Sequence, residues 1–169
     1  MSEASGNLSI ETAPADHHRE GDEVPPLEQI TIVVPGTRTA KARPRFTKTG
    51  HVYTPATTKA AEQAITTAWI KAAGNRAPHT GPVHVRAQFV FEPPKSWTNT
   101  KRELAIAGQH PHTSKPDLDN LIKIIDGLNG RAWIDDAQII NVAGRKDYGS
   151  EALSRFILTF HAPKNNTDK

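Results

Sequence analysis

The sequence predicts a small single α+β domain with a mixed or mainly antiparallel sheet and two main helices, and three segments carry this prediction. Residues 30–34 are a run of β-branched side chains, which is typical of a strand. Residues 83–91 alternate apolar side chains with others, as a strand with one buried face does. Residues 118–128 repeat Leu and Ile at helical spacing. The 169 residues are enough for one core.

The other elements follow from local signals along the chain. Residues 43–46 and 51–53 can pair as a hairpin, and the Ala-rich stretch 56–73 has its apolar residues at helical spacing before a Gly-Asn stop. Later signals predict a short helix and the last two strands, at 101–107, 138–142 and 154–161. The expected order is strand, hairpin, helix, strand, two helices and two strands.

Charge divides the chain into a tail and a body. Of the 21 Lys and Arg only Arg19 lies in residues 1–29, whereas seven of the 18 Asp and Glu lie there. We therefore expect residues 1–29 to form a disordered acidic tail and residues 162–169 a frayed end, around a domain over 30–161. Residues 30–169 keep 20 bases and 11 acids, a net charge of +9. Such a basic body favours a nucleic-acid partner, although a solvated basic surface is the plain alternative.

Composition excludes several classes of protein. No apolar run approaches the roughly 20 residues of a membrane-spanning helix, and no N-terminal secretion signal is recognisable, so we expect a cytoplasmic protein without membrane contact. The absence of Cys excludes disulfides, thiolate zinc sites and cysteine nucleophiles. No glycine-rich phosphate loop or dinucleotide fingerprint is present, so no nucleotide cofactor is expected.

Acidic residues gather around the helix predicted over 118–128. Asp117 and Asp119 lie at its start, where one of them could simply be an N-cap and the other a first-turn acid. Lys123 follows Asp119 by one turn, in the order that favours a surface ion pair. Asp135 and Asp136 follow the helix, and a returning chain could bring at most one of them back to its start.

Three carboxylates packed together would need a cation to offset their repulsion. Oxygen ligands without Cys or clustered His select Mg²⁺ or Mn²⁺, and such ions act on phosphate esters. A nearby Lys adds positive charge for the transition state. An acidic pocket in a basic body is therefore the combination expected of a nuclease.

The motifs around these acids resemble those of the RusA family of Holliday-junction resolvases, which occur in bacteria and their prophages. The resemblance rests on KPDLDNLIK at 115–123, Asn-Gly at 129–130 and WIDDAQI at 133–139, with a weaker likeness over 35–55. It covers about residues 30–161, which is the whole predicted domain.

The resemblance implies that Asp117, Asp119 and Asp136 bind magnesium and that Lys123 is catalytic, with Asp135 and Asn120 in supporting roles. It also implies a homodimer that binds branched DNA and nicks two opposing strands of a four-way junction, in DNA recombination and repair. A two-fold dimer carries two symmetric sites, which suits paired cuts.

Basic residues of the body are the candidate phosphate contacts. They are Arg38, Lys41, Arg43, Arg45, Lys48, Arg145 and Lys146. The sequence thus predicts a Mg²⁺-dependent endodeoxyribonuclease specific for four-way junctions. The alternatives are a metal-dependent nuclease for other branched DNA and a non-catalytic nucleic-acid-binding module whose acids are only helix caps.

Overall fold

The main sheet of the protein has four strands in the order β1-β6-β4-β5. In the computed structural model, which describes residues 26–36, 45–46, 52–53 and 55–163, these strands are β1 (Pro26–Pro35), β4 (Val83–Phe91), β5 (Ile139–Tyr148) and β6 (Leu153–His161). β6 lies antiparallel to both β1 and β4, whereas β5 runs parallel to β4. The sheet is therefore mixed, and the predicted α+β class is confirmed.

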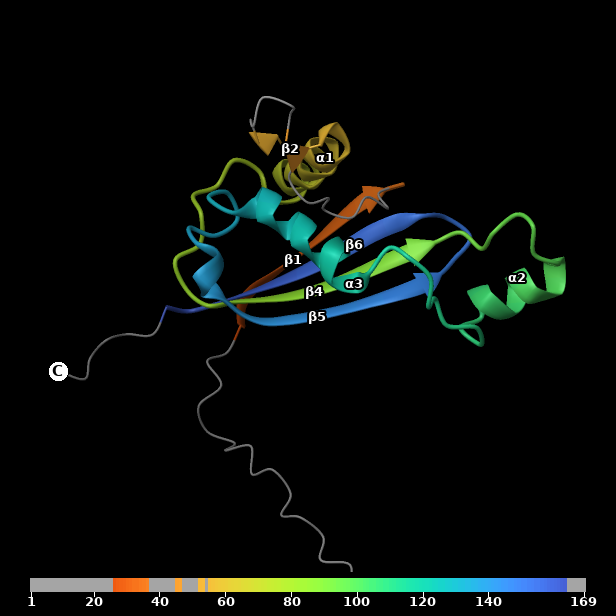
Figure 1. The fold of residues 1–169 in the computed structure, drawn as a ribbon. Coiled ribbons are helices and arrows are strands. Elements are labelled where there is room, and N and C mark those ends of the chain that lie inside the picture. Colours follow the sequence, from red (N-terminus) through yellow and green to blue (C-terminus); the bar gives the residue numbers. More distant parts are fainter. Residues whose placement is uncertain (1–25, 37–44, 47–51, 54, 164–169) are drawn as a thin grey trace, which may run out of the picture.

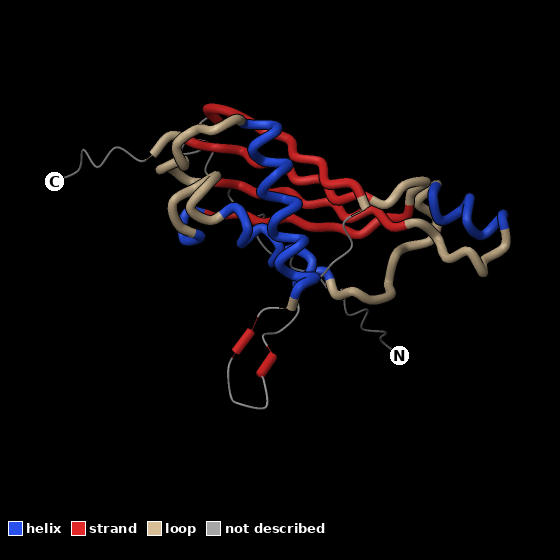
Figure 2. The backbone as a smooth tube through the Cα atoms, turned by 90° about the horizontal axis from the view of Figure 1, so that it is seen from above, coloured by secondary structure: helices blue, strands red, loops and turns tan. Residues whose placement is uncertain are grey.

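Helices cover one face of this sheet (Figures 1 and 2). They are α1 (Ala56–Ala73) and α3 (Leu118–Ile122), the second of which continues as the 3₁₀ helix η1 (Lys123–Leu128). No described helix covers the opposite face, and α2 (Asn99–Ile106) extends beyond the ends of β4 and β5 (Figure 1). Among the described helices, none is both long and apolar enough to cross a lipid bilayer.

The core lies between the helices and the sheet because the strands alternate their side chains. The inward residues of β4, from Val83 to Phe91, are buried at every second position, as predicted. Trp69 of α1 and Trp133 pack into the same core, and Trp133 is 0% exposed. A polar bond ties the helices together, since the Thr66 hydroxyl donates to the Gly127 carbonyl at 2.9 Å.

Three boundaries differ from the sequence prediction. β1 begins at Pro26, so residues 26–29 belong to the strand and not to the expected tail, and Glu28 forms an ion pair with Arg76 at 2.6 Å. The expected helix over 118–128 tightens into 3₁₀ geometry at Lys123. A repeat of three residues per turn places Leu121, Ile124 and Gly127 on one face, where a Gly127 Cβ would lie 3.0 Å from a backbone oxygen of α1.

The third difference lengthens the sheet. β5 continues to Tyr148, beyond the expected end at 142, because it pairs with β4 as far as Phe91. The expected short hairpin is present as β2 (Arg45–Phe46) and β3 (Val52–Tyr53), which pair antiparallel. The tail residues 1–25 and the end residues 164–169 lie outside the described part of the chain.

Candidate active site

Asp117 occupies the N-cap of α3, and its carboxylate has no partner among the described residues. Its backbone takes the N-cap position, with φ −70° and ψ 141°, but its side chain accepts no capping hydrogen bond. The residue is exposed, and its carboxylate makes no hydrogen bond or ion pair with any other described residue. The expected positions, with Asp117 at the N-cap and Asp119 in the first turn, are therefore confirmed, although the Asp117 side chain forms no capping hydrogen bond.

Asp119, in the first turn of α3, is held by Lys123. The Lys123 Nζ donates to Asp119 Oδ2 at 3.1 Å and to Asn120 Oδ1 at 3.3 Å, so the predicted ion pair is confirmed. The hydrogen bond from this ammonium group holds the pKa of Asp119 below its usual range. Asp119 is consequently ionised at neutral pH, and Lys123 is held beside Asp119 and Asn120.

Lys146 of β5 fixes the segment that leads into Asp117. Its Nζ donates to the carbonyl oxygens of Ser114 at 2.7 Å and Pro116 at 3.0 Å. An ammonium group bonded to two carbonyls restrains the backbone just before the helix. This contact therefore helps to set where the Asp117 carboxylate stands.

Asp135 and Asp136 occupy a separate rigid turn, η2 (Asp136–Gln138). The Asp135 carboxylate accepts from the Ala137 amide at 2.8 Å, and Gln138 Oε1 accepts from the Asp135 amide at 2.9 Å, which completes a capping box. Asp136 Oδ1 accepts from the Nε1 of buried Trp133 at 2.9 Å. Asp135 is thus a capping residue. Asp136 is exposed, and one of its carboxylate oxygens is hydrogen-bonded to Trp133.

The sequence analysis missed Gln138, which secures this turn. Its Nε2 also donates to the carbonyls of His79 at 2.9 Å and Gly81 at 2.8 Å, next to the start of β4. The signal was present, because Asp followed three residues later by Gln is the pattern of a capping box.

The structure brings Lys123 to Asp119, two residues after Asp117, but within one chain it gathers no metal-binding group that includes Asp136. Among the described residues, no three His, Asp or Glu side chains lie close enough to hold a metal ion. The cause is the helix between them: a β-bridge joins Trp133 to Asn129, at the far end of η1. The two exposed carboxylates at the start of α3 suit a hard divalent cation, but the described residues of one chain do not supply a third carboxylate beside them.

Comparison with protein families matches residues 35–156 to the family described as endodeoxyribonuclease RusA. The chain belongs to the RusA family. It is also 32% identical over 134 residues to the uncharacterised protein YqaN of Bacillus subtilis (strain 168), a match that spans 74% of this chain and 92% of YqaN. RusA-family proteins are endodeoxyribonucleases that resolve Holliday junctions, which implies a branched DNA substrate, and they generally depend on divalent metals.

Only two of the basic residues predicted to contact DNA in this RusA-family chain have described side chains. Arg145 is exposed on β5 and forms an ion pair with Asp147 at 2.9 Å, and Lys146 is bound to the two carbonyls given above. The side chain of Arg45 and the whole of Arg38, Lys41, Arg43 and Lys48 lie outside the described part.

Two arginines that the sequence analysis missed join Arg145 on the open face of the sheet. Arg86 and Arg155 line a hollow of 390 Å³ with Arg145, Gln88 and small residues of β5. A hollow of 120 Å³ continues past Arg86, and one of 390 Å³ shares Gln88 and Arg145 and reaches Lys146. We call these three adjoining hollows the arginine groove. Alternation along β4 and β6 places these arginines opposite the core, a signal available only once the strands are paired.

The arginine groove is positively charged and ordered by hydrogen bonds. Its lining holds four cations, with Lys146 as the fourth, and one acid, Asp147, a net charge of +3. Arg155 donates to Gln88 at 3.1 Å, and Gln88 donates to Asp147 at 2.7 Å. Arg86 makes no hydrogen bond or ion pair with other described residues, so its guanidinium is free for a phosphate.

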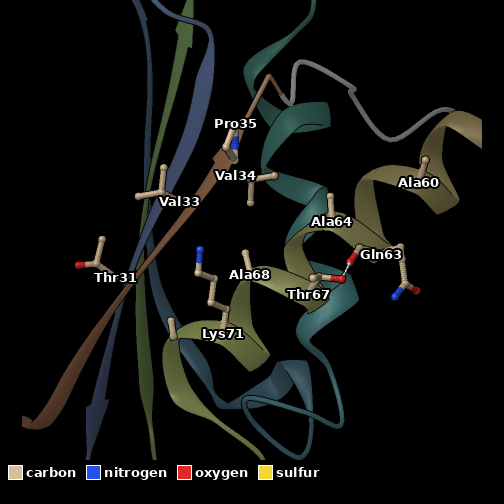
Figure 3. Close-up of a pocket in the computed structure, with 11 residues that line it drawn as sticks. Thr31, Val33, Val34, Pro35, Ala60, Gln63, Ala64, Thr67, Ala68 and Lys71 are labelled. Atoms are coloured by element: carbon tan, nitrogen blue, oxygen red, sulfur yellow. Dashed lines mark hydrogen bonds between the residues drawn. The ribbon is translucent and has the colours of Figure 1, made fainter.

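A larger cavity of 860 Å³ lies between β1 and α1 (Figure 3). It is lined by small and apolar residues, and its one charged side chain is Lys71. Because no carboxylate lines it, this cavity does not suit a metal ion.

Proposed function

We propose that the chain is a Mg²⁺-dependent endonuclease that resolves four-way DNA junctions by paired symmetric nicks, acting as a homodimer in DNA recombination and repair. The observation that carries the proposal is the pair of exposed carboxylates, Asp117 and Asp119, at the start of α3. The Asp117 side chain forms no capping hydrogen bond, and Asp119 accepts a hydrogen bond from Lys123. Family membership supplies the reaction class, and these residues supply groups suited to it.

The proposed ligands are Asp117 and Asp119 at the start of α3 and Asp136 of the η2 turn, which one chain does not gather into a single metal-binding group, with Mn²⁺ as a substitute for Mg²⁺. A bound cation of this type supplies Lewis acidity towards the scissile phosphate. Lys123 keeps a positive charge at the site, suited to the charge that develops on the leaving oxygen. Its bonds to Asp119 and Asn120 orient the ammonium group before substrate arrives. Asp135 acts through the turn that it caps and not as a ligand.

The DNA surface is proposed to include the arginine groove. A row of cations with a single, already paired acid suits a phosphodiester backbone. The groove reaches Lys146 of the edge strand β5, whose Nζ bonds to the segment just before Asp117. The unplaced bases Arg38, Lys41, Arg43, Arg45 and Lys48 are proposed as further phosphate contacts.

The direct test is incubation of the protein with a synthetic four-way junction, with and without Mg²⁺, and mapping of cuts on denaturing gels. We expect cuts at symmetric positions on two opposing strands, and none with a chelator present. Asp117→Asn should abolish cleavage while junction binding persists, because it removes charge without bulk. Glu151→Gln, the same change at an exposed acid in the β5–β6 turn, is the matched control and should cut normally.

The same gels separate the alternatives. Cleavage of forks or flaps in preference to four-way junctions would indicate a nuclease for other branched DNA. Tight binding without cleavage of any substrate would indicate a non-catalytic binding module. Unchanged cleavage by the Asp117→Asn protein would remove Asp117 from the site.

A further inference from the structure

The segment between α2 and α3 carries Asp117, a proposed metal ligand, at its end. The structure assigns no helix or strand to residues 107–117, which run back from α2 to α3 past the end of β5 (Figure 1). Because such a segment has no ladder of backbone hydrogen bonds, its position depends on where its side chains are anchored. The position of the Asp117 carboxylate therefore depends on these anchors.

His112 is the first anchor, and it packs on two paired residues at the ends of β4 and β5. Its ring centroid lies 4.2 Å from that of Phe91 and 4.7 Å from that of Tyr148. Phe91 and Tyr148 are register partners in the sheet, and both are buried. A ring that contacts both of them extends the core to the segment, and aromatic contacts of this kind are favourable beyond the apolar area that they bury.

Lys146 anchors the residues that follow His112 to the same strand. Its Nζ donates to the carbonyl oxygens of Ser114 at 2.7 Å and Pro116 at 3.0 Å. Lys146 and Tyr148 are two residues apart on β5, so residues 112–116 are held at two neighbouring points of the strand. Together the two anchors hold the chain up to the residue before Asp117.

The surroundings of His112 favour its uncharged ring. Its Nδ1 atom is buried and has no hydrogen-bond partner among the described residues. The titratable and charged groups in the hollow beside the ring are His110, Arg145, Lys146, Asp147 and Tyr148, since β4 and α2 contribute only uncharged side chains to it. The one acid, Asp147, is already bonded to Arg145 and Gln88.

A proton on the His112 ring would thus be a buried charge that no acid in this hollow is free to offset. Burial lowers the pKa of His112, and the Lys146 charge acts in the same direction, while the His112 backbone opposes them in part. The packed position and the protonated ring are therefore in conflict.

We propose that His112 is a positioning residue: its uncharged ring, packed on Phe91 and Tyr148, holds residues 112–116 so that the Asp117 carboxylate stands where the cleavage reaction needs it. The inference rests on the proposed nuclease function. Because the packed ring has the lower pKa, falling pH favours release of the segment. The stabilisation by packing is lost as pH falls from the ordinary His pKa of about 6.5 through the lowered value. Cleavage is then lost in mild acid, before the carboxylates take up protons.

Two substitutions of His112 separate positioning from packing alone. His112→Phe keeps an aromatic ring that takes no proton, and His112→Ala removes the ring. Single-turnover cleavage of four-way junctions is measured from about pH 8 to about pH 5, the range in which His changes its charge. At the upper end we expect His112→Phe to cut within about twofold of wild type, and His112→Ala about tenfold more slowly at unchanged junction affinity. As pH falls, the His112→Phe rate should exceed the wild-type rate by up to about tenfold for each unit below the lowered pKa.

His110→Phe is the matched control, because it makes the same change two residues earlier. The His110 ring lies 4.9 Å from that of Trp97 and 6.3 Å from that of Tyr148, on the outer side of the cluster. Its rate should fall with pH as the wild-type rate does. Equal pH profiles for the wild-type and His112→Phe proteins, or a wild-type rate for a folded His112→Ala protein, would overturn the positioning role but not the nuclease proposal. A wild-type protein that cuts no junction at any pH would overturn the nuclease proposal.

Nuclear magnetic resonance tests the anchor without activity. The His112 ring and the backbone amide of Asp117 are followed as the wild-type protein is titrated over the same pH range. We expect both signals to change with one midpoint, below about 6.5, and the Asp117 amide to stay constant over this range in the His112→Phe protein. Urea titration shows whether each variant is folded under the assay conditions. An Asp117 amide that does not respond when the His112 ring takes up its proton would overturn the inference.

Discussion

Gly144 of β5 and Ile122 of α3 are in closer contact than a side chain on Gly144 would allow. An ideal Cβ at Gly144 would lie 2.6 Å from Ile122 Cδ1 and 3.4 Å from Leu118 Cδ1. The missing side chain lets the first turn of α3 lie directly on the strand. Glycine here serves close packing, and this packing sets the position of Asp117 and Asp119 above β5.

Gly144→Ala should therefore disturb the site as well as the fold. The added methyl group has to displace the end of Ile122, and overpacking of this kind costs about 1–3 kcal/mol of unfolding free energy. We expect a lower midpoint of unfolding in urea. We also expect a loss of junction cleavage larger than the loss of stability explains, because the added methyl group moves α3 away from β5. Urea titration and single-turnover cleavage measure the two effects.

Ile122→Val provides the rescue, since it removes the Cδ1 atom that the new methyl would meet. Alone it should cost about 0.5–1.5 kcal/mol. Combined with Gly144→Ala, it should restore part of the lost stability and cleavage, and the double-mutant cycle gives the coupling. Simple addition of the two single effects would show that this contact does not place α3.

Lys146→Met tests whether Lys146 contacts DNA, as the sequence predicts, or positions the segment before Asp117. The sequence suggested a phosphate contact, whereas the structure places its Nζ on the Ser114 and Pro116 carbonyls. If Lys146 acts by positioning, kcat should fall about tenfold while KM and the salt dependence of binding change little. Lys115→Met, at the exposed neighbouring lysine, is the control and should behave as wild type. A shallower salt slope with normal kcat would restore the phosphate role.

Local patterns identified most of the elements of the fold. The apolar alternation of β4 and the Ala-rich spacing of α1 gave elements at the predicted positions because both depend on neighbouring residues. Features that depend on contacts between distant segments could not be predicted from these local patterns. β5 runs on to Tyr148 because β4 offers a parallel partner that far, and η1 tightens where Gly127 meets α1.

The part of the site that depends on neighbouring residues could be predicted, and the part that depends on distant segments could not. Asp119 and Lys123 are one helical turn apart, so their ion pair could be read from spacing alone. The position of Asp136 depends on where the chain turns after η1, and the bond to Trp133 fixes it away from α3. Arg86 and Arg155 lie almost 70 residues apart in sequence, and strand register alone makes them neighbours.

The pKa of Asp119 should depend on Lys123. The ammonium hydrogen bond lowers that pKa in the folded protein, so the pair contributes stability above the unfolded pKa of Asp and loses it as pH falls through the lowered value. The contribution is small because the pair is exposed to solvent. Lys123→Met should raise the pKa of Asp119, as measured by carboxyl NMR titration, whereas Lys146→Met should leave it unchanged. An unchanged pKa in the Lys123→Met protein would show that the pair is absent in solution.

The arginine groove makes a separate prediction for DNA binding. Arg86 has no partner among the described residues, so Arg86→Ala removes a free guanidinium without breaking an internal bond. We expect junction binding to weaken about fivefold, or roughly 1 kcal/mol, and the slope of log affinity against log salt to become shallower by about 0.9. Arg155→Ala should act similarly but also free Gln88, which its guanidinium now holds at 3.1 Å.

Arg131→Ala is the matched control for the groove, because Arg131 is exposed in the loop after η1 and does not line it. It should leave both affinity and salt slope at the wild-type values. The Arg86→Ala protein should still cut bound junctions at the wild-type single-turnover rate when DNA is saturating, because Asp117, Asp119 and Lys123 are untouched. Equal salt slopes for the wild-type, Arg86→Ala and Arg131→Ala proteins would mean that DNA does not enter the groove and that the phosphate contacts lie elsewhere.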